Sequence, residues 1–177
     1  MRHGSTGWNE RKKLQGRTDI PLSEDGRQMA KRAAVEYANV HFDVCYCSPL
    51  KRAKETADIV LEGRDIPIIT DDRLMEMSFG QYEGVEDYRN KSDCPVSVLF
   101  NDPAAYVATG GAESFEELFA RTGEFVEEVI EPLLGQNKDV LIVGHGAMNT
   151  SIICRMKNIP TDKFWTVGIP QCELIRV

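Results

Sequence analysis

Histidine is scarce in this chain, with three residues among 177, and their spacing matches no metal-binding motif. Basic residues are outnumbered as well: 21 Lys and Arg stand against 28 Asp and Glu, which gives a formal net charge of −7. Binding to nucleic acid through a broad basic surface is therefore not expected, and an anionic ligand has to be held by a local cluster of cations. The sequence predicts no metal, no other cofactor and no nucleic-acid partner.

Apolar runs long enough to span a membrane, roughly 18 to 20 residues, are missing, and so is the pattern of a signal peptide. We therefore expect a cytoplasmic protein without a membrane partner. The five cysteines are odd in number and scattered, which favours reduced thiols over a disulfide framework. Cys45 and Cys47 form the only close pair, and on a strand both point to one face, so we interpret them as small buried apolar residues.

The length is that of one domain, residues 1–177, whose core is large enough to need no disulfide or metal. Apolar residues at helical spacing alternate along the chain with short apolar runs. Helices are predicted over 24–39, 115–133 and 147–157 and between the cap Ser48 and Gly63, and strands over 43–47, 66–70, 140–143 and 173–177. The stretch 74–101 is predicted to form loops and short helices. This order of elements predicts a three-layer α/β fold with a mostly parallel central sheet flanked by helices.

Two of the three histidines lie in similar settings, Arg2-His3-Gly4 and Gly144-His145-Gly146. Taken singly, each has a structural interpretation, a mobile terminal residue for His3 and a helix cap for His145. His145 directly follows the apolar run 140–143, however, and Arg52 follows the predicted strand 43–47. Because the carboxyl ends of parallel strands meet at one edge of a sheet, we expect these side chains to converge on one pocket, where helix N-termini add N–H donors for an anion. Imidazoles beside an arginine favour phosphoryl transfer through a histidine nucleophile.

Several short segments carry a recognisable pattern in a fixed order. They are Arg2-His3-Gly4-Ser5-Thr6-x-x-Asn9, Gln15-Gly16-Arg17-Thr18-Asp19, Ser48-Pro49-Leu50-x-Arg52-Ala53, Leu74-x-Glu76, Gly110-Gly111-x-Glu113-Ser114 and Val143-Gly144-His145-Gly146. Together they resemble the histidine phosphatase superfamily, the phosphoglycerate mutase-like proteins, over nearly the whole chain. The resemblance implies an α/β fold whose central sheet is flanked by helices, in agreement with the pattern of elements.

Carried over position by position, the resemblance implies that His3 attacks phosphorus and becomes a phosphohistidine. It implies that Arg2, Arg52 and His145 bind the transferring phosphoryl oxygens and that Asn9 is a further hydrogen-bond donor. These roles suit the chemistry, because negative charge collects on the equatorial phosphoryl oxygens and fixed cationic donors stabilise it.

Glu76 matches the family's general acid, which protonates the leaving oxygen and later takes a proton from water.

The expected activity is that of a metal-independent, histidine acid phosphatase-like phosphomonoesterase acting on a small phosphorylated metabolite. Phosphoglycerate mutase-type transfer is an alternative, although only Arg89 and Lys91 are basic between positions 85 and 111, where mutases carry more cations. A non-catalytic module that binds a phosphorylated ligand or inorganic phosphate is a further alternative. The basic run 11–13 is expected to be simply solvated. The sequence leaves the substrate and the oligomeric state undetermined.

One departure from the family pattern concerns the first strand. In the family, several apolar residues precede the Arg-His-Gly segment and form a central strand, whereas here only Met1 does. We therefore expect a sheet whose usual first strand is truncated, with a vacancy or a substitute at its centre. A loosely held His3 would then lower the activity relative to a chain extended at its N-terminus by an apolar strand.

Overall fold

A parallel sheet of three strands lies at the centre of the structure, a computed structural model that describes residues 1–91 and 93–177. The strands are β1 (Val44–Cys47), β2 (Ile68–Thr70) and β3 (Val140–Val143), and their order is β2-β1-β3. In the parallel register, Cys45 of β1 lies opposite Ile68 on one side and Leu141 on the other. Parallel neighbours need a crossover connection, and α3 (Lys51–Val60) makes the one between β1 and β2.

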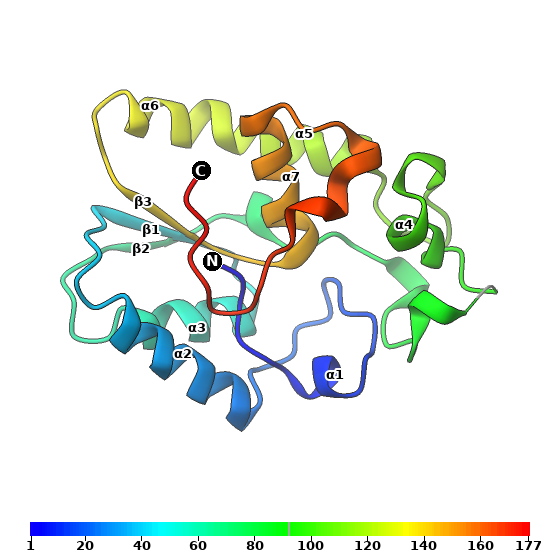
Figure 1. The fold of residues 1–177 in the computed structure, drawn as a ribbon, viewed down its shortest axis with the longest axis horizontal. Helices are drawn as coiled ribbons and strands as arrows, with labels where there is room; N and C mark the ends of the chain where they lie inside the picture. Colours follow the sequence, from blue (N-terminus) through cyan, green and yellow to red (C-terminus); the bar gives the residue numbers. More distant parts are fainter. Residues whose placement is uncertain (92) are drawn as a thin grey trace.

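Helices cover both faces of this sheet, as Figure 1 shows. On one face lie α2 (Glu24–Glu36) and α3, and on the other lie α5 (Phe115–Phe125), α6 (Glu131–Leu134) and α7 (Gly146–Lys157). A π-helical turn, Val126–Ile130, joins α5 to α6, so the predicted helix 115–133 is present with one irregular turn. The predicted α/β fold, three layers with a parallel sheet, is confirmed. No helix within the described ranges is both long and apolar enough to cross a membrane.

Shorter elements make up the irregular parts of the chain. They are the helices α1 (Gly7–Glu10) and α4 (Ser97–Asn101) and the 3-10 turns Asp72–Leu74, Gly80–Tyr82, Tyr88–Asn90, Pro103–Ala105 and Thr161–Val167. The predicted mixture of loops and short helices over 74–101 is confirmed for its described residues, and position 92 lies outside them. Sequence reasoning missed α1, although Thr6 and Asn9 form a capping box at its start.

The caps of the longer helices are those predicted, with one exception. The Ser23 side chain accepts a hydrogen bond from Gly26 N at the start of α2, and Ser114 and Glu117 form a capping box at the start of α5. Ser48 was expected to cap α3, but that helix begins at Lys51 and its N-cap residue is Leu50. Ser48 Oγ accepts from Leu50 N at 3.3 Å, just before the helix, and makes its other hydrogen bond to a histidine of the candidate site.

The core lies on both faces of the sheet. Cys45 and Cys47 are fully buried among the apolar residues between the sheet and α2 and α3, which confirms their predicted packing role. All five cysteines are free and buried. On the other face, Phe125 of α5 packs against Met148 of α7. The two helix layers thus hold the carboxyl ends of β1 and β3 in fixed positions.

The first residues of the chain lie beside the end of β3. The α-amino group of Met1 donates to Ile142 O at 2.7 Å, Gly144 N donates to Met1 O at 3.0 Å, and His3 N donates to Gly144 O at 2.9 Å. On the other side, Cys172 N donates to Arg2 O at 2.8 Å. Backbone hydrogen bonds on both sides therefore hold the segment 1–3, which substitutes for the end of the expected strand.

An apolar groove of about 570 Å³ continues from Met1 along the outer edge of β3. It lies between Val140 and Ile142 on one side and the chain's last residues, 174–177, on the other. The predicted final strand, 173–177, is wrong, because these residues are in no regular element. The physical reason is that the groove separates them from β3, so no neighbouring strand offers them ladder hydrogen bonds.

Candidate active site

His3 lies beyond the carboxyl end of β3 and has its lone pair on a defined ring nitrogen. Its Nδ1 is 2.7 Å from Gly4 O, and a carbonyl oxygen only accepts, so Nδ1 carries the proton. Its Nε2 is 3.3 Å from Arg52 Nε, and a guanidinium only donates, so Nε2 is the acceptor. The ring is 3 % exposed. This geometry presents an unprotonated nitrogen toward a cation in a nearly dry pocket.

Burial and charge both favour the neutral form of His3. The pKa of His3 is lowered well below its usual value of 6.5, first by burial of the ring and then by the positive charges of Arg52 and Arg2. An imidazole with this environment is unprotonated at neutral pH. The condition for a nitrogen nucleophile is therefore met without a separate base.

Arg52 is the most deeply buried cation of the site, with a side chain that is 0 % exposed. Besides its contact with His3, it donates to Gly16 O at 2.6 Å and to Thr18 O at 3.0 Å. Burial lowers its pKa to about 10, which still leaves it charged at neutral pH. Since these partners are neutral, the positive charge of Arg52 is not neutralised by direct contact with a carboxylate.

Arg2 approaches the same place from the chain's first segment. It donates to Ile169 O at 3.3 Å, and its Nε is buried without a hydrogen-bond partner among the described residues. Its pKa is lowered, chiefly by burial. Among the described residues, neither Arg2 nor Arg52 forms an ion pair, whereas Arg17, Arg73 and Arg121 do. Two buried guanidinium groups without carboxylate partners next to an imidazole are the strongest sign of an anion site.

His145 follows β3 and is fully buried, with its ring centroid 5.1 Å from that of His3. Its Nε2 is 2.8 Å from Ser48 Oγ, and Ser48 Oγ also accepts from Leu50 N. The serine hydroxyl can donate to Nε2 or accept from it, according to the tautomer of the ring, and the ring's Nδ1 is buried and has no partner in the described part of the chain. Burial, followed by the charge of Arg52, lowers the pKa of His145 well below 6.5. His145 thus presents a neutral ring whose Nδ1 has no competing partner among the described residues.

Glu76 is held at the N-terminus of α7. Its Oε1 accepts from Met77 N at 2.9 Å and from Met148 N at 3.0 Å, and its Oε2 accepts from Ala147 N at 3.2 Å. Gly146 has no side chain here: a Cβ at that position would lie 3.6 Å from Glu76 Oε2 and 3.9 Å from Arg2 Cζ. The carboxylate and the Arg2 guanidinium therefore approach each other over this glycine.

Asn9 lies one layer further out, beside Arg2. Its Oδ1 accepts from Thr6 N at 3.2 Å and from Gln171 Nε2 at 3.1 Å, and its Nδ2 donates to none of the described residues. Asn9 and Arg2 line the same hollow of about 410 Å³. The structure thus brings His3, Arg52 and His145 together, places Arg2 and Glu76 over Gly146, and places Asn9 at the rim.

A cluster of three charged residues behind Glu76 was not predicted. Glu113 is buried and accepts from Arg121 Nε at 2.6 Å and from Arg17 at 3.0 Å. Arg121 in turn donates to Met75 O at 2.8 Å, and Arg17 Nε donates to Glu76 O at 3.2 Å. The backbone that carries Glu76 is therefore fixed by two arginines that share one carboxylate. The motifs that contain Arg17 and Glu113 were signals for two members, but nothing in the local pattern marks Arg121 on α5.

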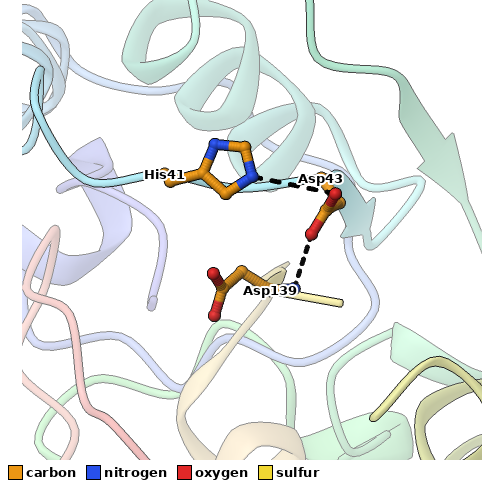
Figure 2. A group of neighbouring side chains, drawn as sticks. All are labelled: His41, Asp43 and Asp139. Carbon is orange, nitrogen blue, oxygen red and sulfur yellow. Dashed lines mark hydrogen bonds and ion pairs between the residues drawn. The ribbon is translucent and has the colours of Figure 1, made fainter. Parts of the chain in front are cut away.

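The described residues contain one group of three side chains suited to a metal ion, His41, Asp43 and Asp139 (Figure 2). Asp43 already accepts from Lys138 Nζ at 2.9 Å and from Asp139 N at 2.7 Å, and His41 Nε2 is 3.7 Å from it. The group lies at the amino ends of β1 and β3. It is therefore at the opposite end of these strands from His145 and takes no part in the candidate active site.

The chain is similar to several known proteins along most of its length. The family model of the "Histidine phosphatase superfamily (branch 1)" matches residues 1–177. Phosphoserine phosphatase 1 of Hydrogenobacter thermophilus is 32 % identical over 95 % of this chain and 79 % of its own length. A 2,3-bisphosphoglycerate-dependent phosphoglycerate mutase of Cytophaga hutchinsonii is 31 % identical over 92 % of this chain and 78 % of its own length.

Solved structures of similar proteins also superpose on this chain along most of its length. YhfR of Bacillus stearothermophilus superposes with a TM-score of 0.83 at 34 % identity and covers 96 % of this chain and 83 % of its own. A mycobacterial glucosyl-3-phosphoglycerate phosphatase in complex with VO3 has a TM-score of 0.81 at 29 % identity, over 94 % of this chain and 84 % of its own. The relatives in this group therefore include both phosphatases and mutases.

Proposed function

The chain belongs to the histidine phosphatase superfamily, branch 1, and from this membership we propose that it is a phosphomonoesterase that hydrolyses a small phosphorylated metabolite through a phosphohistidine at His3. The single observation that supports this most strongly is the pairing of Arg52 with the lone pair of His3, at 3.3 Å, in a pocket where neither Arg2 nor Arg52 has a carboxylate partner among the described residues. A phosphoryl group is the ligand whose charge and size complete such a pocket.

In the first step, the lone pair of His3 Nε2 attacks phosphorus as the bond from phosphorus to the leaving oxygen breaks. Glu76 gives its proton to that oxygen, so the alcohol departs and a carboxylate remains. Arg2, Arg52 and the Nδ1–H of His145 stabilise the negative charge on the equatorial oxygens. The fixed Nδ1–H bond from His3 to Gly4 O holds the ring in the attacking orientation.

In the second step, the Glu76 carboxylate takes a proton from water, and the water oxygen attacks the phosphorus of the phosphohistidine. The P–N bond breaks, its electron pair returns to Nε2, and inorganic phosphate leaves. Glu76 is protonated again, so atoms, charge and protons balance over the cycle. Every group named is supplied by this chain, and the proposed reaction needs no metal ion.

Hydrolysis and mutase transfer share the first step and differ only in whether water or a second substrate receives the phosphoryl group. The scarcity of basic residues after Glu76, where only Arg89 and Lys91 occur between positions 85 and 111, supports hydrolysis. Some relatives are named phosphatases and others mutases. Product analysis with 3-phosphoglycerate separates the two, because a mutase forms the 2-phospho isomer and a phosphatase forms glycerate and phosphate.

The proposal is tested by release of phosphate from 4-nitrophenyl phosphate in the presence of a metal chelator. We expect turnover by the unaltered chain and none above background for His3→Ala, with the melting temperatures of the two compared as a check on folding. A chain that binds inorganic phosphate but turns over no ester is a binding module instead, and activity that survives in His3→Ala excludes the proposed nucleophile.

A further inference from the structure

We propose that His41, Asp43 and Asp139 together bind a divalent metal ion at the amino ends of β1 and β3, with Zn²⁺ preferred over Mg²⁺ and Ca²⁺. The inference goes beyond the proposed function and does not depend on it, because this cluster lies at the end of the strands opposite to His145. The ion would join the two strands where their pairing begins.

The backbone brings the three side chains together. His41 and Asp43 lie two residues apart on the segment that leads into β1, and Asp139 directly precedes β3. Asp43 N donates to Asp139 O at 2.8 Å, and Asp139 N donates to the Asp43 carboxylate at 2.7 Å. One ligand atom of each side chain lies within 4.8 Å of the other two, and Figure 2 shows the three side chains around a common space. The cluster is therefore fixed by the start of the sheet.

Each member of the cluster has a lone pair that a metal ion can use. A carboxylate offers about four acceptor positions, and Asp43 uses one for Lys138 Nζ, at 2.9 Å, and one for Asp139 N. The Asp139 carboxylate accepts no hydrogen bond from the described residues. His41 Nε2 is 3.7 Å from Asp43 Oδ1, which is beyond hydrogen-bond distance. Small side-chain rotations would bring the three ligand atoms to about 2.0–2.2 Å from one ion.

The charge of the cluster favours a cation. Asp43 and Asp139 place two carboxylates close together, and Lys138 is the one lysine or arginine that forms an ion pair with either of them in the described part of the chain. The Lys138 side chain is 45 % exposed, so it is able to turn into solvent when an ion binds. The His41 side chain is 72 % exposed, which leaves the cluster open to ions from solution. A divalent ion would relieve the repulsion between the two carboxylates.

The ligand types select the metal. One imidazole nitrogen and two carboxylate oxygens, completed by water, form a set that Zn²⁺ uses in proteins. Mg²⁺ and Ca²⁺ prefer oxygen ligands alone, and metals that prefer thiolates find no cysteine in this cluster. An ion held by residues from both segments binds the folded chain and would stabilise the pairing of β1 with β3.

The test is a calorimetric titration of the chain with Zn²⁺ in a phosphate-free buffer. We expect one ion per chain at this cluster, and an affinity lower by about tenfold or more in His41→Gln and in Asp139→Asn, since each variant removes one ligand. Lys138→Met should raise the affinity about fivefold, the screened Coulomb effect of a unit charge about 5 Å from a divalent ion in water. Co²⁺ in place of Zn²⁺ should show the visible absorption of a four-coordinate ion without a thiolate charge-transfer band.

Asp65→Asn is the matched control, because it removes one carboxylate at an exposed position before β2, at the same end of the sheet. It should leave the affinity for Zn²⁺ unchanged, and so should His3→Ala, which removes an imidazole of the candidate active site. The melting temperatures of the metal-free variants check their folding.

Four results would overturn the inference. They are the absence of saturable Zn²⁺ binding, binding that persists undiminished in His41→Gln or Asp139→Asn, binding that is lost in His3→Ala, and equal affinity for Mg²⁺. Phosphate release in the presence of a chelator should be the same in His41→Gln as in the unaltered chain. A failure of this inference is thus distinct from a failure of the proposed function.

Discussion

The guanidinium of Arg52 donates through Nε to the Nε2 of His3 at 3.3 Å, and the same side chain donates to Gly16 O and Thr18 O. Burial of the ring, followed by the charge of Arg52, lowers the pKa of His3. Arg52 also donates to the lone pair of the imidazole and connects the ring to the loop before α2. Arg52 thus connects the nucleophile directly to the framework of the site.

Arg52→Lys should lower kcat/KM by about 100-fold to 1,000-fold, the loss typical of removing one fixed donor to a developing charge. A lysine keeps the charge but lacks the fork that reaches two carbonyl oxygens and His3 together. Steady-state kinetics with 4-nitrophenyl phosphate measure the effect. Arg32→Lys, at an exposed position on α2, is the control and should be unaffected. Unchanged activity in Arg52→Lys would mean that charge alone is sufficient.

Glu76→Gln should lose most turnover with poor leaving groups, since a proton donor matters little when the leaving oxygen is already stable as an anion. A set of phosphate esters with alkyl and nitrophenyl leaving groups measures the difference in kcat. Glu10→Gln, an exposed acid on α1, is the control. An equal loss with alkyl and nitrophenyl esters would count against a general acid at position 76. It would favour a role in holding the start of α7, because Glu76 accepts from Ala147 N and Met148 N.

Gly4→Ala should destabilise the protein and lower its activity. A Cβ at Gly4 would lie 2.5 Å from Gly26 O, a backbone atom at the start of α2 that cannot turn aside. Overpacking of this kind costs about 1–3 kcal/mol, and here the displaced backbone is that of the residue after His3. Gly7→Ala is the matched control, because nothing lies within 4 Å of its Cβ position. Chemical denaturation and turnover measured on both variants check the prediction, and equal stability of the two would contradict it.

Extending the chain before Met1 by about five apolar, β-branched residues should raise both the melting temperature and the turnover. The extension would fill the groove of about 570 Å³ and pair with the backbone of Val140, whose N–H and C=O face away from β1. It would also replace the buried α-amino group by a neutral peptide N–H and add to the hydrogen bonds that already hold the segment of His3. Equal turnover and equal melting temperature for the two chains would show that the prediction is wrong.

The gain in stability should depend on pH in a defined direction. Burial lowers the pKa of the Met1 α-amino group from 8.0 to about 6. Between pH 6 and pH 8 the unfolded chain therefore binds more protons at this group than the folded one, so its contribution makes the free energy of unfolding rise with pH. A shift of this size corresponds to about 2–3 kcal/mol. The advantage of the extended chain should be largest at pH 6 and smaller at pH 8, as measured by denaturation at each pH.

Local patterns were sufficient for most of the fold. The apolar run of β3 and the caps Ser23 and Ser114 lie in short stretches whose chemistry determines their structure, and the structure has them as expected. The final strand was predicted wrongly because residues 173–177 have a strand-like composition but no neighbouring strand. A strand depends on a partner, and a single segment cannot show whether the partner is there.

The site shows the same division between local and distant information. Motifs pointed to His3, Arg52 and His145, and the structure brings these three together. Arg121 escaped notice because its importance comes from hydrogen bonds to the carbonyls of Arg73 and Met75, which are distant in sequence. Ser48 was likewise interpreted from its neighbours as a helix cap, because its hydrogen bond with His145 joins residues that follow two different strands.

The most direct test of the account is to look for the covalent intermediate. The protein is mixed with a ³²P-labelled ester, and the reaction is quenched within milliseconds in alkaline detergent. The quench is alkaline because a P–N bond is hydrolysed in acid. We expect label on the protein that is stable to alkali, lost in acid, mapped to His3 and missing from His3→Ala. No label in a chain that turns over the ester, or undiminished label in His3→Ala, would contradict it.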